Sequence, residues 1–187
     1  MPVARLAILG TGLIGASVGL AAKRAGVAHV AGWDPDPEAR EGARERGAVD
    51  AAAATLAEAL EGADLAVVAA PVGLLGEQVE AALRASADGT TVTDVGSTKA
   101  PVCAAAGSSA RFIGGHPMAG GEARGPAHAK AELFEGATWF LTPTAATAPD
   151  RYRLVHGFVA ELGAKPVAVD PASHDRLVAL TSHLPHA

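Results

Sequence analysis

Short apolar runs alternate with longer, alanine-rich segments along most of the chain, and this alternation predicts strands and helices in turn. The predicted strands are Val3–Leu9, His29–Trp33, Leu65–Ala70, Thr91–Val95, Arg111–Gly115, Thr138–Thr142 and Pro166–Val169. The predicted helices cover residues 13–25, 36–46, 55–60, 74–85, 99–106, 126–132, 148–162 and 171–181. Repeated strand–helix–strand units are typical of a mostly parallel sheet with helices on both faces. We therefore expect a Rossmann-type, doubly wound α/β fold.

Composition favours one main domain that binds small molecules. A chain of 187 residues can bury one substantial core, and its net charge of −5 argues against a nucleic-acid surface. No apolar segment approaches the roughly 20 residues that cross a bilayer, so we expect a cytoplasmic protein without a membrane partner. The only cysteine, Cys103, has no disulfide partner in the chain and is expected to be a small buried residue on a helix.

The first predicted strand passes directly into the motif G-x-G-x-x-G, formed by Gly10, Gly12 and Gly15. Gly10 permits a tight turn, Gly12 lets the backbone approach a pyrophosphate, and Gly15 lets the helix pack close to the strand. A glycine-rich turn without a ligand is the alternative. The strand before the motif and the helix after it favour a dinucleotide site, with Leu13 and Ile14 at the N-terminus of the helix.

Asp34 follows the second predicted strand, about 20 residues after the glycines. A carboxylate there accepts hydrogen bonds from the ribose hydroxyls and repels a 2′-phosphate, which favours NAD over NADP. The alternative roles are a helix cap for Asp34 and contact of Arg40 or Arg44 with a 2′-phosphate. Ala70, which ends the third predicted strand, and Pro71, which follows it, complete the predicted cofactor site.

Hydride transfer from an alcohol requires a proton acceptor, and neutral imidazole suits this task near neutral pH. His116 is the candidate, although its glycine-rich surroundings are equally typical of a histidine bonded to turn backbone. Ser97 is placed to orient a substrate hydroxyl or the imidazole, or else to cap the following helix. Lys99 is expected to be a solvated residue in the first turn of that helix.

Three polar clusters make the sequence resemble the prephenate and arogenate dehydrogenases. They are D-x-x-S-x-K at 94–99, G-H-P-M-A-G-x-E at 115–122 and S-H-L-P-H at 182–186. The resemblance extends over the whole chain and implies NAD-dependent oxidation and decarboxylation of prephenate or arogenate in tyrosine biosynthesis. It implies that His116 bonds the ring hydroxyl of the substrate with Ser97 beside it. It also assigns the substrate pocket to Glu122, Ser182, His183 and His186.

Several polar residues retain alternative interpretations. His183 and His186 have a spacing that a metal pair could use, but Pro185 between them disfavours a regular helix and we predict no metal. Glu122 is equally typical of an exposed loop charge. Arg124 is placed to attract an anionic substrate, but a solvated arginine is the commoner case. Gly121 departs from the serine or threonine of many family members. Adjacent His174 and Asp175 are expected to point in different directions on a helix and to be structural.

In the dehydrogenases that this sequence resembles, S-H-L-P-H begins a largely helical second domain that forms the dimer. The sequence stops at Ala187. We therefore expect an NAD-binding domain at residues 1–180 and the start of a truncated helical domain at 181–187, with a homodimer for the full-length parent. The alternatives are an NAD-binding module without catalysis and another Rossmann dehydrogenase, such as a β-hydroxyacid type.

Overall fold

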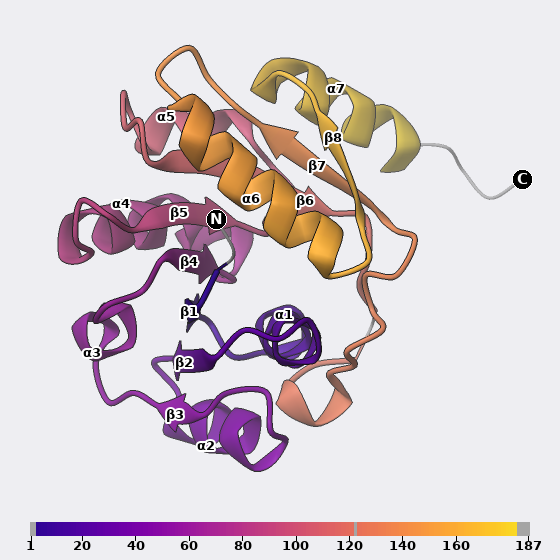
Figure 1. Cartoon of the computed structure of the whole chain (residues 1–187). Helices are drawn as coiled ribbons and strands as arrows, with labels where there is room; N and C mark the ends of the chain where they lie inside the picture. Colours follow the sequence, from indigo (N-terminus) through magenta and orange to yellow (C-terminus); the bar gives the residue numbers. More distant parts are fainter. Residues whose placement is uncertain (1–2, 122, 183–187) are drawn as a thin grey trace, which may run out of the picture.

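The computed structural model describes residues 3–121 and 123–182, which form one mostly parallel sheet with helices on both faces (Figure 1). The strands are β1 Arg5–Leu9, β2 His29–Trp33, β3 Ala51–Ala52, β4 Leu65–Val68, β5 Thr91–Asp94, β6 Phe112–Pro117, β7 Thr138–Thr142 and β8 Lys165–Ala168. Their order across the sheet is β3-β2-β1-β4-β5-β6-β7-β8. Every neighbouring pair is parallel except β6 and β7, which are antiparallel. The first six strands therefore have the Rossmann order.

The connecting segments are helical. The α-helices are α1 Leu13–Arg24, α2 Pro37–Glu45, α3 Leu56–Leu60, α4 Leu75–Ala85, α5 Ala100–Ala105, α6 Pro149–Glu161 and α7 Pro171–Ser182. Two 3-10 turns, η1 Val72–Leu74 and η2 Pro126–His128, lie between them. Helices α1, α2 and α6 contribute to the core on one face of the sheet, and α3, α4 and α5 to the core on the other. Helix α7 contacts β7 and α5.

The two cores explain why β4 and the buried part of β1 are continuous apolar runs. Along β1, Leu6 and Ile8 pack into the core beneath α1, whereas Ala7 and Leu9 pack into the core beneath α4. Successive side chains of a strand point to opposite faces, so a strand covered on both sides buries every residue. The predicted α/β class with helices on both faces is confirmed.

The predicted strands are all present with small shifts at their ends, but two local predictions are wrong. The edge strand Ala51–Ala52 was not predicted, because two alanines carry no apolar alternation. The helix predicted over residues 126–132 is only the 3-10 turn η2, since the backbone is extended again at Ala129. The predicted boundary after residue 180 falls within the last turn of α7, and the division into domains stays a prediction.

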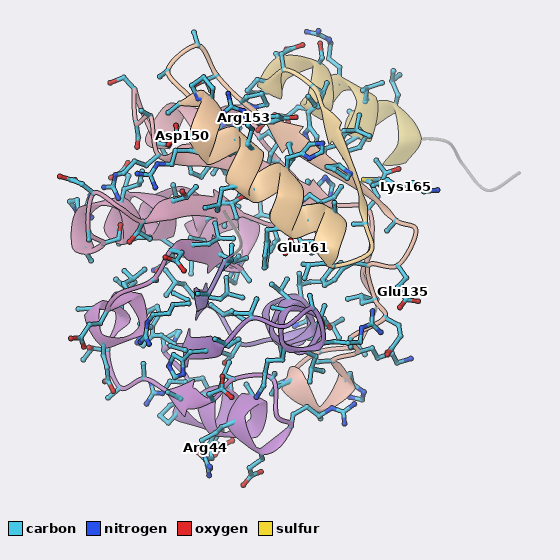
Figure 2. All side chains as sticks on the ribbon, viewed as in Figure 1. Arg44, Glu135, Asp150, Arg153, Glu161 and Lys165 are labelled. Atoms are coloured by element: carbon cyan, nitrogen blue, oxygen red, sulfur yellow. The ribbon has the colours of Figure 1, made fainter. Side chains whose placement is uncertain are left out.

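Ionisable side chains lie mainly at the outside of the fold. Figure 2 labels six exposed examples that point away from the sheet: Arg44, Glu135, Asp150, Arg153, Glu161 and Lys165. Asp94 and Lys99 are instead fully buried. Within residues 3–121 and 123–182, no helix combines the length and apolar character of a membrane span.

Candidate functional site

A cleft of about 670 Å³ opens at the carboxyl ends of the parallel strands. It is lined by every residue predicted to bind the cofactor: Gly10, Gly12, Leu13, Ile14, Gly15, Asp34, Ala70 and Pro71. It is also lined by both predicted catalytic residues, His116 and Ser97. Ligands of open α/β sheets bind at this edge, so one depression brings together residues that lie far apart in the sequence.

The three fingerprint glycines occupy three different environments. Gly10 has a φ of +105°, and a Cβ there would lie 2.4 Å from the carbonyl oxygen of Ala69. A Cβ on Gly15 would lie 1.9 Å from the carbonyl oxygen of Gly10, so the helix packs too closely for a side chain. A Cβ on Gly12 would meet nothing within 4 Å. Gly10 and Gly15 are thus required by the fold, whereas the open space at Gly12 fits a pyrophosphate.

The N-terminus of α1 is suited to an anion. Gly12 is the N-cap, no side chain of residues 3–121 and 123–182 hydrogen-bonds to the free N–H groups, and the first turn contains no acidic residue. These N–H groups and the helix dipole favour negative charge at the floor of the cleft. A cofactor pyrophosphate therefore fits the residues present here.

Asp34 is fixed at the edge of the cleft by backbone contacts. Its carboxylate accepts hydrogen bonds from the N–H groups of Thr11 at 2.8 Å and Asp36 at 3.0 Å. The predicted capping role is wrong, because Asp36 caps α2 through the N–H of Glu38. The guanidinium of Arg40 donates to the carbonyl of Asp34 at 2.7 Å.

The second arginine considered for a 2′-phosphate, Arg44, is engaged with Glu41. This exposed ion pair lies along α2 and does not involve the cleft. Among the described cleft residues, Asp34 is therefore the charged group beside the end of β2. Its fixed carboxylate is compatible with ribose hydroxyls and opposes a 2′-phosphate.

The buried pair of Asp94 and Lys99 overturns the prediction that Lys99 is solvated. The Lys99 ammonium contacts the Asp94 carboxylate and donates to the carbonyl of Gly115 at 2.7 Å. Asp94 also accepts N–H hydrogen bonds from Gly96 at 2.8 Å and Gly115 at 3.0 Å. Burial raises the pKa of Asp94, and the ammonium and the N–H donors oppose this rise. The pair joins the end of β5 to β6 beside His116.

Ser97 is exposed and lines the cleft between Gly96 and the start of α5. The alternative role as a helix cap is wrong: α5 begins at Ala100, its N-cap is Lys99, and the N–H groups of Lys99 and Ala100 donate to the carboxylate of Asp175. The hydroxyl of Ser97 is therefore not required by the helix. Its place on the same cleft as His116 is compatible with contact to a ligand.

His116 lies near the end of β6 and is half-buried at the cleft wall. Its Nδ1 is 2.9 Å from Nε2 of His174, which leaves Nε2 of His116 for a molecule in the cleft. Burial first, and then electrostatic interactions with His174 and Lys99, lower the pKa of His116 from 6.5 to about 4, while Asp175 opposes the shift. The imidazole is therefore neutral near pH 7 and can accept a proton.

The prediction that His174 and Asp175 point in different directions is wrong. Nδ1 of His174 lies 2.8 Å from Oδ1 of Asp175, although the two residues are adjacent on α7. Nδ1 is close to the backbone, so a short carboxylate on the next residue reaches it from the side. No spacing rule in the sequence identifies this contact, because it depends on the packing of α7 against β7 and α5.

Part of the predicted substrate site lies outside the described residues. This applies to Glu122, His183 and His186, and to the side chain of Ser182. Arg124 lines the cleft and is exposed. In the part of the chain that the structure describes, no three His, Cys, Asp or Glu side chains gather as a metal site would require. Cys103 is buried on α5, as predicted.

Comparison with known proteins gives a consistent picture. Residues 18–168 match the family described as prephenate dehydrogenase, nucleotide-binding domain. The prephenate dehydrogenase of Lactococcus lactis subsp. cremoris is 33% identical over 189 residues, which cover 97% of this chain and 51% of the relative. The chain spans about half the length of the curated relatives it matches.

Two solved structures resemble the whole chain. Prephenate dehydrogenase from Aquifex aeolicus, in complex with hydroxyphenyl propionate and NAD+, has a TM-score of 0.89 and 30% identity, covering 100% of this chain and 66% of its own. Synechocystis arogenate dehydrogenase has a TM-score of 0.88 and 34% identity, covering 97% of this chain and 65% of its own. Both likenesses extend beyond the six Rossmann strands to β7, β8 and α7.

Proposed function

Because this chain belongs to the prephenate dehydrogenase family and contains its nucleotide-binding domain, we propose that the protein uses NAD to oxidise prephenate or arogenate. The ring alcohol is oxidised, carbon dioxide is lost, and the ring becomes aromatic. One observation carries the proposal: a neutral imidazole, His116, lies on the same cleft as the glycine fingerprint. A hydride acceptor and a proton acceptor can therefore meet one substrate carbon.

Different residues of the cleft bind different parts of the cofactor. The free N–H groups at the start of α1 hold the pyrophosphate, and Gly12 leaves room for it. Asp34 accepts hydrogen bonds from the adenosine ribose, which favours NAD over NADP. When bound, NAD supplies the hydride acceptor. Leu13, Ile14, Ala70 and Pro71 provide the remaining contact surface.

His116 accepts the proton of the substrate hydroxyl at Nε2 while the carbon that carries this hydroxyl loses its hydride. Ser97 orients the hydroxyl from the same wall of the cleft. The bond to the ring carboxylate then breaks, carbon dioxide leaves, and the released electron pair completes the aromatic ring. This loss makes the reaction effectively irreversible. The proposed substrate contacts are Glu122, Ser182, His183 and His186.

We also propose how the full-length protein assembles and where it is located. By similarity to its family, the full-length protein is a homodimer in the cytoplasm, and its partner in the reaction is a small molecule. The net charge of −5 is consistent with the absence of a nucleic-acid partner. Residues 1–180 form the NAD-binding domain, and residues 181–187 begin the helical domain.

The test is an absorbance assay at 340 nm with the whole natural polypeptide that contains these 187 residues. NAD is supplied with prephenate or, in parallel, with arogenate. We expect a rise with at least one substrate and a loss of about 10²–10⁴-fold in kcat for His116→Gln, the range typical of a general base. His128→Gln is the matched control, because His128 is exposed and does not line the cleft.

Two alternatives give different results in the same assay. A nucleotide-binding module without catalysis would bind NAD but turn over neither substrate. A β-hydroxyacid dehydrogenase would reduce NAD with 3-hydroxy acids and not with prephenate or arogenate. Either result would overturn the proposal.

A further inference from the structure

A buried histidine on α7 contacts His116 on the side away from the cleft. His174 is fully buried, does not line the cleft, and places Nε2 2.9 Å from Nδ1 of His116. Its ring also meets Phe140 edge to face, with centroids 5.4 Å apart and planes at 81°. Phe140 pairs with His116 across β6 and β7, so His174 packs on two neighbouring side chains of the sheet. The orientation of the His174 ring is therefore fixed from two sides.

Asp175 determines which nitrogen of His174 carries hydrogen. Its Oδ1 lies 2.8 Å from Nδ1 of His174 and accepts the N–H of Lys99 at 2.7 Å, while Oδ2 accepts the N–H of Ala100 at 2.9 Å. Burial raises the pKa of Asp175, but the hydrogen bonds from His174, Ala100 and Lys99 outweigh it and keep the pKa below its usual value. An ionised carboxylate only accepts, so Nδ1 of His174 must donate.

The donor of the hydrogen bond between His174 and His116 then follows from the donor at Asp175. A neutral imidazole has one N–H, so in the neutral form of His174 this hydrogen is on Nδ1 and Nε2 is an acceptor. Nδ1 of His116 must donate to that acceptor. Nε2 of His116 is left with a lone pair, which is the form that a proton acceptor needs.

From this order of donors we infer that Asp175 and His174 are positioning residues that keep the lone pair of His116 on Nε2, the nitrogen available to the cleft. The inference rests on the proposed function, in which His116 takes the hydroxyl proton. Neither residue lines the cleft, and both act through His116. These hydrogen bonds run from the start of α5 through Asp175 and His174 on α7 to His116 on β6, so the fold itself selects the tautomer of His116.

The contacts with His174 and Asp175 also affect the stability of the positive charge that His116 acquires during turnover. Once protonated, His116 still donates from Nδ1 to His174, and the Asp175 carboxylate stabilises the positive charge from the far end. His174 and Lys99 are the other ionisable groups that act on His116, and both oppose this charge. Removal of the Asp175 charge should therefore lower the pKa of His116 further.

The first test is NMR of the ¹⁵N-histidine-labelled protein near pH 7, using long-range ¹H–¹⁵N correlations, with His116→Gln to assign the signals. We expect His116 to carry hydrogen on Nδ1 and none on Nε2. A wild-type spectrum with hydrogen on Nε2 of His116 would overturn the inference. This measurement needs no turnover, so it separates failure of the inference from failure of the proposed function.

The second test follows the pKa of His116 by the same method in Asp175→Asn, with Arg176→Gln, an exposed neighbour on α7, as the control. Loss of the carboxylate charge should move the pKa below its wild-type value. Loosened packing would do the opposite, because hydration of His116 removes the main cause of its low pKa. A pKa that rises or stays unchanged in Asp175→Asn contradicts the positioning role.

Kinetics provide a third readout. Both Asp175→Asn and His174→Phe should lower kcat by at least about tenfold while the KM for NAD stays near the wild-type value, because only the orientation of the base changes. Arg176→Gln should leave both constants unchanged. A rise in the KM for NAD with unchanged kcat would assign the two residues to cofactor binding instead and refute the inference.

Discussion

At the scale of single residues, the glycine fingerprint combines demands of the fold with demands of the ligand. Gly10 and Gly15 lack space for a Cβ because backbone oxygens lie in the way. Gly12 has a φ of −69° and open space, so nothing in the described fold requires a glycine there. The need at Gly12 arises only when a pyrophosphate approaches the backbone.

We therefore expect Gly12→Ala to fold normally and to bind NAD at least about tenfold more weakly. Its free energy of unfolding should change by less than about 1 kcal/mol, since a poorer N-cap and a less flexible unfolded chain oppose one another. Gly15→Ala is the matched comparison and should lose about 1–3 kcal/mol through overpacking. Urea unfolding and calorimetric titration with NAD measure both effects, and equal destabilisation of the two variants would refute the distinction.

At the scale of elements, the buried Asp94 and Lys99 pair connects the polar end of β5 to β6, the strand that contains His116. Lys99 reaches the carbonyl of Gly115, the residue before His116, while its own N–H donates to Asp175 on α7. One residue thus joins β5, β6 and α7 around the imidazole. Burial of such an ion pair costs free energy, but removal of one partner destabilises the fold more, because it leaves an uncompensated buried charge.

Lys99→Met should accordingly lower the free energy of unfolding by about 3–5 kcal/mol, measured by urea denaturation. The double variant Asp94→Asn with Lys99→Met removes both charges and should recover a substantial part of this loss. Lys165→Met is the control, because Lys165 is exposed on β8. A loss below about 1 kcal/mol for Lys99→Met would show that the pair does not hold these elements together.

At the scale of the whole molecule, the cleft lies where several strands end, so a cofactor bound there contacts much of the sheet edge. A ligand that binds only the folded state stabilises it by mass action. At 100 times the dissociation constant the gain is about 2.7 kcal/mol. For a domain of this size, that corresponds to a rise of about 5–10 °C in Tm.

We expect NAD to raise the Tm of the wild-type protein by this amount in a thermal unfolding scan. NADP at the same concentration should raise it less, because Asp34 opposes a 2′-phosphate. Gly12→Ala should show a reduced shift with NAD. Equal shifts with the two cofactors would contradict the role of Asp34, and no shift with either would contradict cofactor binding at this cleft.

The sequence by itself determined every strand except the edge strand β3, the α/β class and the cofactor edge of the cleft. These features are local: a strand buried on both faces must be apolar, and a strand–turn–helix around a pyrophosphate needs glycines at fixed spacing. Asp34 and His116 were predicted as site residues in the same way, Asp34 from its position after a predicted strand and His116 from its position between glycines. Such signals survive in a single sequence because each depends on a few consecutive residues.

Only the tertiary structure decided the surroundings of His116. Lys99 was expected in solvent, but it is buried. His174 and Asp175 were expected to point in different directions, but they are joined to His116 in one series of hydrogen bonds. Residues 58 positions apart meet there because α7 packs on β7 and α5. Burial in that contact lowers the pKa of His116 and fixes its donors, and no local pattern encodes an environment built from distant segments.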